Sequence, residues 1–413
     1  MKKWFCMFLI IILIFTTGCP GNEKKKSNES NKVEVNKSEN KIDKNAASAF
    51  INNYLAYVLK GDFDGMKSFY NDEVKSQIKS IPVSSSSRPV GYKIDTDDSG
   101  LEESQNEGKS AAFKVHLFNS GQDIPYFSDD LYKYTVELKN NKMVISKIEK
   151  EKSTEIYEKN KVLYKREGDK IKGEKILSLS EMPDFISLSN TLYPGQKIPL
   201  PKDGFGPCAI SPDGKNILIT TKGTLKTAGA SGGSIKNDVT YAFIAILSMK
   251  EDEQQSIQQN KNTKDSKQVI KLEGGGDEKN KEESSGNEES KTGAEGQEKE
   301  KVQLPSIKTL DLYVEAKIKT AAFSPDGKFI IVEYIPPSGL NRIKMYKVQE
   351  REIVELIVDR QFLPDRFGIV SPAFISFEEL SFKVVPSKDA TSEEQKYEGI
   401  WKMDIKEQKL KPF

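Results

Sequence analysis

The chain has 413 residues, and its 63 lysines and arginines nearly balance its 62 aspartates and glutamates. Balanced charge, without a basic stripe of interleaved aromatic residues, argues against nucleic acid as a partner. The length allows two domains of roughly 150 residues each. The hydrophobic content of 36% is modest, which fits compact domains joined by polar segments.

The N-terminus begins with two lysines and an apolar run, Trp4 to Phe15. This run is shorter than the ~20 apolar residues that span a membrane, and it has the length of a signal-peptide core. It ends in Thr16-Thr17-Gly18-Cys19, which resembles a bacterial lipobox, although leucine is usual where Thr16 stands. The resemblance implies that residues 1–18 are removed, that Cys19 carries palmitate and other acyl chains, and that the protein is anchored on the extracytoplasmic face of the cell membrane. A plain secretory signal or a short uncleaved anchor is the alternative.

Residues 19–44 lack aromatic side chains and are rich in Lys, Asn, Ser and Glu. Such a composition cannot bury enough apolar surface to order the chain, so it predicts a disordered tether. A basic lipid-binding patch is the alternative, but interspersed glutamates dilute its charge.

The pattern becomes helical at Asn45, a good N-cap residue, and Gly61 and Asp62 suit the end of one helix and the start of the next. Beyond Ser84–Ser87 the period becomes two, as in strands. One face then carries Phe113, Val115 and Leu117, and the other carries Lys114, His116 and Phe118. A second alternating strand over 132–138 leads through an Asn140-Asn141 turn into a third, closing a hairpin.

Two helices ending in GDFDGMKSFY, followed by strands ending in YTVELKNNKMVISKIEK, resemble the NTF2-like (cystatin-like) superfamily over residues 45–152. The resemblance implies an α+β cone, in which a curved sheet wraps helices over a pocket. This superfamily includes both enzymes and non-catalytic modules, so the fold alone does not decide function.

Residues 153–413 contain a repeated corner. Ala209 to Lys215 and Ala322 to Lys328 both read A-x-S-P-D-G-K before an apolar strand, and a degenerate copy begins at Ser371-Pro372. Proline presets φ, aspartate bonds its own backbone, and glycine takes positive φ, which together make a turn between buried strands. The turn residues are Ser211, Pro212, Asp213, Gly214, Ser324, Pro325, Asp326 and Gly327.

These copies resemble the WD40-like repeats of TolB-type β-propellers, which implies an all-β region of propeller-like blades. A charged segment at about 251–304 has almost no aliphatic residues and predicts a disordered insertion, either a spacer or a docking segment for partners. Without it, the region has room for about four blades, and the propeller is minimal, incomplete or closed by a partner.

Few residues in the chain suggest chemistry. His116 is the single histidine, and with Tyr132 and Tyr134 it forms a candidate pocket. Cys208 is expected to be a buried apolar residue. Gly229 to Gly233 fit the G-x-S-x-G pattern, but no histidine follows to complete a hydrolase site. We therefore predict no catalytic residues, no metal ligands and no cofactor.

The pattern as a whole favours a lipid-anchored, non-catalytic binding or scaffolding module for a peptide, glycan or protein partner in the envelope. One alternative is an NTF2-like enzyme that uses a pocket around His116. A second alternative is a structural envelope protein, in which the tether and the insertion set spacing.

Overall fold

The computed structural model describes residues 42–78, 86–95, 110–187, 197–225, 239–249 and 306–413. The expected signal peptide, Cys19, the charged insertion and the Gly229–Gly233 segment lie outside the described residues, as does the tether up to residue 41. Residues 40–413 form one compact unit. Within the described ranges, no helix has both the length and the apolar character needed to cross a membrane.

Three helices open this unit: α1 (Lys44–Lys60), α2 (Phe63–Lys67) and α3 (Asp72–Gln77). The N-cap of α1 is Asp43, whose side chain accepts the backbone N–H of Asn45, so the helix begins before the cap that the sequence suggested. Gly61 ends α1 in the left-handed conformation, at φ 66°. The Asp62 side chain then accepts the N–H of Gly65 and begins α2.

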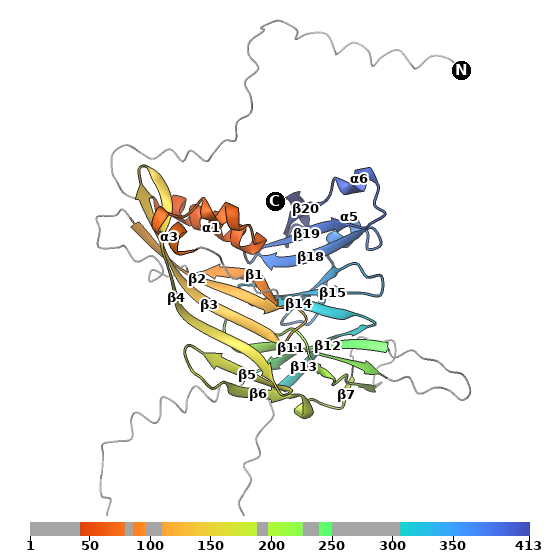
Figure 1. Cartoon of the computed structure of the whole chain (residues 1–413). Coiled ribbons are helices and arrows are strands. Elements are labelled where there is room, and N and C mark those ends of the chain that lie inside the picture. Colours follow the sequence, from red (N-terminus) through yellow and green to blue (C-terminus); the bar gives the residue numbers. More distant parts are fainter. Residues whose placement is uncertain (1–41, 79–85, 96–109, 188–196, 226–238, 250–305) are drawn as a thin grey trace, which may run out of the picture. The chain divides into compact units, whose positions relative to one another are not determined.

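The largest sheet has ten strands in the order β21-β20-β19-β18-β1-β2-β3-β4-β5-β6. Its strands are β1 (Ser87–Ile94), β2 (Ser110–Gly121), β3 (Tyr126–Lys139), β4 (Lys142–Lys159), β5 (Val162–Glu167), β6 (Glu174–Ser178), β18 (Phe367–Phe374), β19 (Glu379–Pro386), β20 (Gly399–Asp404) and β21 (Lys409–Pro412). Strands close to both ends of the described chain therefore share one sheet (Figure 1).

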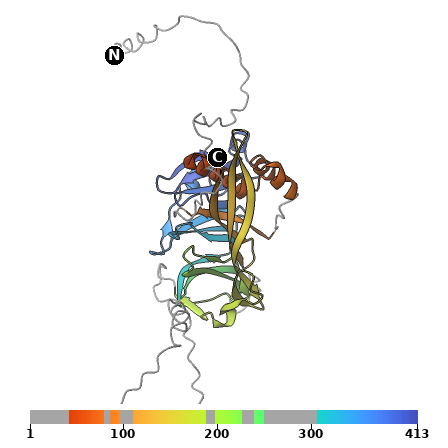
Figure 2. The ribbon, with the colours of Figure 1, turned by 90° about the vertical axis from the view of Figure 1, so that its left-hand side faces the viewer.

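The hairpin of β3 and β4 is much longer than the sequence suggested. Asn140 and Asn141 both have positive φ and connect the two strands, as expected for a two-residue hairpin turn. β4 then continues to Lys159 and pairs with β5. The boundary expected between residues 152 and 153 thus falls inside a continuous strand, which Figure 2 shows running from the helical region down to β5 and β6.

The helices cover one face of this sheet. Ile51 and Leu55 of α1 pack with Phe113 and Val115 of β2 and with Val136 of β3, and all five are fully buried or nearly so. The opposite face of β2 and β3 contributes other residues, such as Phe118 and Phe127, to a second and larger core. Alternation along each strand therefore serves two hydrophobic cores at once, one on each face.

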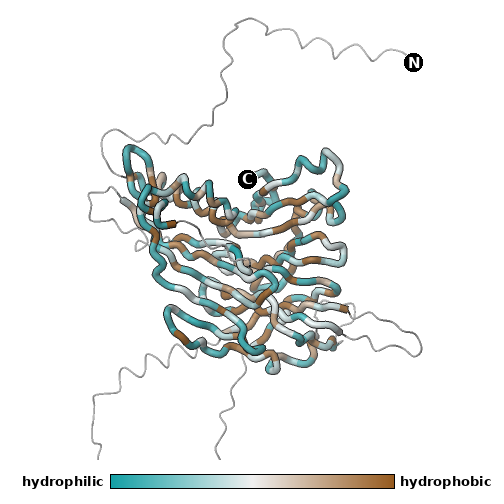
Figure 3. The backbone as a smooth tube through the Cα atoms, in the orientation of Figure 1, coloured by the Kyte–Doolittle hydropathy of each residue, from teal (hydrophilic) through white to brown (hydrophobic). Residues whose placement is uncertain are grey.

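The larger core joins two further sheets and a small hairpin. The five-stranded sheet contains β9 (Gly204–Phe205), β10 (Ala209–Ile210), β11 (Asn216–Leu225), β12 (Val239–Ser248) and β13 (Ser306–Val314). The four-stranded sheet contains β14 (Lys317–Phe323), β15 (Phe329–Ile335), β16 (Arg342–Lys347) and β17 (Ile353–Val354). The remaining elements are β7 (Phe185–Ser187) paired with β8 (Lys197–Pro199), a 3-10 turn η1 (Leu179–Glu181), α5 (Val358–Gln361) and α6 (Ser392–Gln395). Hydrophobic residues are interspersed with hydrophilic ones along many of the strands (Figure 3).

Within these sheets, β3–β6, β9–β13, β14–β17 and β18–β21 form four antiparallel strand groups, although the first and the last belong to one sheet together with β1 and β2, and β7 pairs with β8 alone. The sequence suggested about four blades, and that number stays a prediction. The last group does not meet the first directly, because β1 and β2 lie between β18 and β3. β1 and β18 pair in parallel at Gly91 and Phe374, where a side chain on Gly91 would stand 3.3 Å from the Phe374 carbonyl oxygen.

The two S-P-D-G corners have the same hydrogen-bonded geometry. The Ser211 hydroxyl donates to Asp213 and accepts the N–H of Asn216, and Gly214 takes φ 72°. In the second corner, Ser324 makes the same two bonds, with Asp326 and Phe329 as partners. Each corner therefore satisfies its own polar groups within the turn.

The third copy differs from the other two. Ser371 and Pro372 lie inside β18 at a β-bulge, and Ser371 has φ 56°. The turn into β19 is made further along the chain, where Ile375 and Ser376 donate to the carbonyl of Glu379. Without the aspartate and glycine that shape the other corners, the Ser-Pro pair does not form a turn there.

Candidate functional site

A cavity of about 720 Å³ lies between the helices, the sheet and the C-terminal strands. α1 and α2 form one wall, β1 to β4 form a second, and β18, β19 and β20 form a third. The third wall belongs to the last strand group, more than two hundred residues away in the sequence from the other two. Only the sheet order, through the pairing of β1 with β18, brings it to the cavity.

Tyrosines line much of this cavity. The hydroxyls of Tyr54 and Tyr70 are 2.9 Å apart, and the Tyr54 ring packs edge-on against Tyr134. Burial raises the pKa of all three hydroxyls. Tyr126 and Tyr132 are half-buried lining residues, and burial raises their pKa as well. The five hydroxyls are therefore neutral hydrogen-bonding groups at ordinary pH.

Asp130 is the one carboxylate among the described lining residues, and donors surround it. One oxygen accepts from the Ser153 hydroxyl at 2.6 Å and from the Lys150 ammonium at 2.9 Å. The other accepts from the Ser128 hydroxyl at 3.2 Å and from the Asn119 amide at 3.3 Å. Burial lowers the pKa of Lys150, but the bond and charge of Asp130 outweigh it and the net shift is upward. Both oxygens of Asp130 thus already have donors within the protein.

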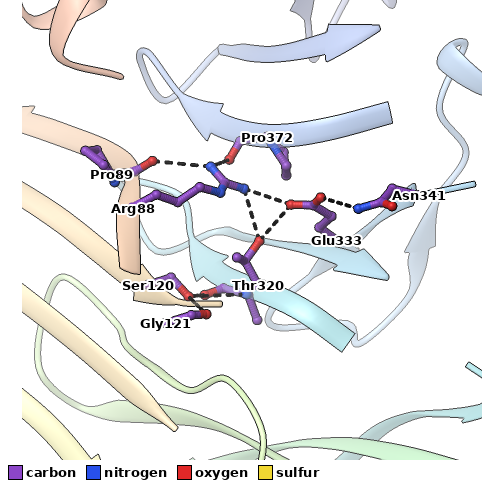
Figure 4. Close-up of polar contacts among 9 residues, drawn as sticks. Arg88, Pro89, Ser120, Gly121, Thr320, Glu333, Asn341 and Pro372 are labelled. Carbon is purple, nitrogen blue, oxygen red and sulfur yellow. Dashed lines mark hydrogen bonds and ion pairs between the residues drawn. The ribbon is translucent and has the colours of Figure 1, made fainter. Parts of the chain in front are cut away.

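Arg88 of β1 also reaches the cavity, and its guanidinium is tied to two neighbouring strand groups (Figure 4). It donates to Glu333 at 3.0 Å, to the Thr320 hydroxyl at 3.1 Å and to the Pro372 carbonyl at 2.9 Å. Glu333 accepts in addition from the Asn341 amide at 2.7 Å. The charge of Arg88 is therefore balanced by a buried carboxylate before any ligand arrives.

Two lysines, Lys60 and Lys383, complete the lining. Lys60 ends α1, and its ammonium lies 3.6 Å from the centre of the Phe413 ring. Lys402 of β20 approaches the same ring at the same distance. Lys383 of β19 is half-exposed and lies 3.8 Å from the exposed carboxylate of Glu398. The lining therefore carries two ammonium groups, one from α1 and one from β19.

The candidate pocket of His116, Tyr132 and Tyr134 does not assemble. Tyr132 and Tyr134 line the cavity, and they pair across the sheet with Val115 and Phe113. His116 projects from the opposite face, where its Nδ1 lies 2.8 Å from Asp129. The enzyme alternative required these three side chains to converge, so its geometric basis is absent.

The other sequence-derived residues lie away from the cavity. The eight corner residues are not among its lining, and Cys208 is fully buried, which raises the pKa of its thiol. No group of three or more metal-ligating side chains occurs in the described ranges.

Sequence reasoning missed Asn119, Ser128 and Asp130. A signal for them existed, because Ser128 and Asp130 stand at even positions with Tyr132 and Tyr134 and so share their face of β3. Lys383 and Ile400 carried no such signal. They reach the cavity only through the pairing of β18 with β1.

No family model matches the chain, and no curated protein matches it. Among solved structures, a putative TolB from Agrobacterium tumefaciens is 11% identical, with 74% of this chain and 88% of that one covered and a TM-score of 0.30. TolB from Acinetobacter baumannii is 9% identical, with 76% and 67% covered and a TM-score of 0.29. A puromycin hydrolase is 8% identical, with 74% and 45% covered and a TM-score of 0.28. TM-scores of this size establish neither a shared fold nor a shared function.

Proposed function

We propose that the protein is a non-catalytic binding module that holds a small ligand, or the end of a peptide or glycan chain, in the cavity between α1 and the ten-stranded sheet. The cavity itself carries the proposal. Its volume of about 720 Å³ falls within the range of roughly 300–1,000 Å³ typical of ligand sites. Its wall combines apolar side chains with a few fixed polar groups, as such sites usually do.

The polar groups of the cavity suit recognition better than catalysis. The described lining residues include no histidine or cysteine. Asp130 is bonded to four donors and Arg88 to a buried carboxylate, so neither has the freedom of a general acid or base. Neutral tyrosine hydroxyls can orient a ligand by hydrogen bonds while their rings contact its apolar parts.

We also propose that the mature chain is anchored through lipidated Cys19 on the outer face of the cell membrane. The support is the N-terminal sequence alone, with its lysines, short apolar run and T-T-G-C ending. Growth with an alkyne-tagged palmitate should label the wild-type chain and a Cys6→Ala variant. Labelling that persists in Cys19→Ala would contradict the anchor.

Native mass spectrometry of the mature chain, purified from its own membrane in mild detergent, tests the binding function. We expect a non-covalent small molecule on the wild-type protein. Leu59→Trp and Ile400→Trp, at two half-buried positions on opposite walls, should fill the cavity and remove it. Leu363→Trp, at an exposed position outside the lining, is the matched control and should keep the ligand.

Two results would contradict the proposal. One is a bound molecule that survives both cavity-filling substitutions while the variants melt like wild type. The other is turnover of generic esterase, peptidase or glycosidase substrates by the purified chain, abolished by substitution of a cavity tyrosine.

A further inference from the structure

The charges around the cavity do not cancel. Four charged side chains line it: Lys60, Arg88, Asp130 and Lys383. Arg88 is neutralised by Glu333 and Asp130 by Lys150, and neither partner is itself a lining residue. Lys60 and Lys383 remain, and among the described residues Lys383 forms an ion pair only with the exposed carboxylate of Glu398, at 3.8 Å. An exposed pair of this kind contributes little, so both ammonium groups stay available to a ligand.

Lys60 is also placed close to another cation. Its ammonium and that of Lys402 both lie 3.6 Å from the centre of the Phe413 ring, and neither forms an ion pair in the part of the chain that the structure describes. Burial lowers the pKa of Lys60, opposed by Asp62. Burial also lowers the pKa of Lys402, opposed by Glu379 and reinforced by Lys411 and Lys60. An anion beside Lys60 would offset the lost hydration of this ammonium group and its repulsion from Lys402.

The rest of the lining is mostly apolar. Half-buried and buried side chains from all three walls present carbon atoms to the interior: Val58, Leu59, Phe63, Met66, Leu117 and Phe382. Burial of apolar ligand surface here favours binding through the hydrophobic effect. A ligand that uses the whole cavity therefore needs an apolar body as well as an anionic end.

We propose that the cavity takes an amphiphile with one anionic head group, a carboxylate or a phosphate, held between Lys60 and Lys383 with its apolar chain among α1, α2 and the sheet. This inference rests on the proposed binding function and adds the ligand's chemical class. Asp130 cannot select a cationic head instead, because four donors already occupy its oxygens.

Isothermal titration of the full mature chain with four twelve-carbon probes tests the charge preference. The probes are dodecanoate, dodecyl phosphate, dodecanol and dodecyltrimethylammonium, each below its aggregation concentration. We expect at least one anionic probe to bind about tenfold or more tightly than dodecanol, because a charge-assisted contact replaces a neutral one. The cationic probe should bind most weakly. The two anionic arms distinguish a carboxylate from a phosphate head.

Lysine substitutions locate the head group. Lys60→Met should weaken binding of the preferred anionic probe by about tenfold and leave dodecanol unchanged. Lys383→Met should weaken it severalfold, since this side chain is more exposed. Lys347→Met, on β16 and outside the lining, is the matched control and should have no effect. Thermal melting of each variant verifies folding.

The outcomes separate the two proposals. Equal binding of dodecanol and the anionic probes, or an anionic preference that survives both lysine substitutions, would overturn the head-group inference but leave a binding cavity. Absence of binding by all four probes would also overturn it. The binding function itself is tested separately, by native mass spectrometry of the cavity-filling variants and by the turnover assays.

Discussion

The guanidinium of Arg88 on β1 lies 3.0 Å from the carboxylate of Glu333 on β15, and both side chains are almost fully buried. The two residues are 245 positions apart. Their ion pair joins the strand that follows the helices to the four-stranded sheet, and the Pro372 carbonyl extends the link to β18. A buried charge pair therefore holds β1, β15 and β18 together, and the third wall of the cavity depends on this arrangement.

Replacing one partner of this pair should destabilise the whole unit. Arg88→Met leaves the Glu333 carboxylate buried without its cation, and we expect the free energy of unfolding to fall by about 3–5 kcal/mol in urea titrations. The double variant Arg88→Met/Glu333→Leu should recover much of this loss, because no lone charge remains. Arg360→Met, which removes an exposed pair with Glu355, should cost less than about 1 kcal/mol. Equal losses for the buried and the exposed pair would contradict this account.

Replacing either corner glycine by a residue with a side chain should lower the stability of the fold. Gly214 and Gly327 have φ of 72° and 74°, where an L-residue is strained by roughly 1–2 kcal/mol. Gly214→Ala and Gly327→Ala should therefore each lower the free energy of unfolding, measured by urea titration, by about 1–2 kcal/mol. Gly204→Ala, at a glycine without positive φ whose added methyl meets only an ordinary contact, is the control and should change stability by less than about 0.5 kcal/mol. A corner variant as stable as this control would show that the turn tolerates other backbone geometries.

His116 should make stability depend on pH. Its hydrogen bond with Asp129 raises its pKa, against burial, and Asp95 adds to the rise while Lys93 opposes it. Protonation therefore stabilises the folded state. This contribution is complete below the unfolded pKa of about 6.5 and is lost as pH rises through the higher folded-state pKa.

NMR titration measures this directly, because His116 is the single histidine of the chain. We expect its pKa to lie above the unfolded value and to fall in Asp129→Asn. The stability advantage of wild type over His116→Gln should shrink from about pH 5.5 to about pH 8.5. A pKa that does not respond to Asp129→Asn would show that the observed contact does not control the titration.

The charged insertion should be dispensable for folding. The residues that flank it, Ser248 at the end of β12 and Ser306 at the start of β13, are cross-strand partners. Replacing residues 251–304 by Asn-Gly leaves a five-residue loop between Ser248 and Ser306, a length that hairpins commonly use, and should leave the thermal midpoint and the circular dichroism spectrum close to wild type. Loss of cooperative melting would contradict the view that this segment is a spacer or a docking segment.

Local chemistry explains which features the sequence could predict. The Gly61-Asp62 junction, the Asn140-Asn141 turn and the two S-P-D-G corners each involve residues a few positions apart, so their side chains and backbone preferences act without tertiary context. Strand alternation also placed His116 on the face opposite Val115. It could not supply the register that pairs Val115 with Tyr132 and so separates His116 from the tyrosines.

The remaining features depend on long-range pairing. Gly91 of β1 pairs with Phe374 of β18, and no sequence pattern within either segment predicts that pairing. The position of Lys383 in the cavity follows from it. The length of β4 is a similar case, because its polar second half between Glu149 and Lys159 is stabilised by pairing with β3 and β5 rather than by its own apolar residues.

Hydrogen–deuterium exchange of the full mature chain, with and without saturating dodecanoate, tests most directly whether one ligand contacts all three walls. We predict slower exchange in α1 and α2 and, at the same time, in β19 and β20, with the sheet β14–β17 unchanged. Protection confined to a single wall, to the β14–β17 sheet or to no segment at all would contradict the composite cavity as the binding site.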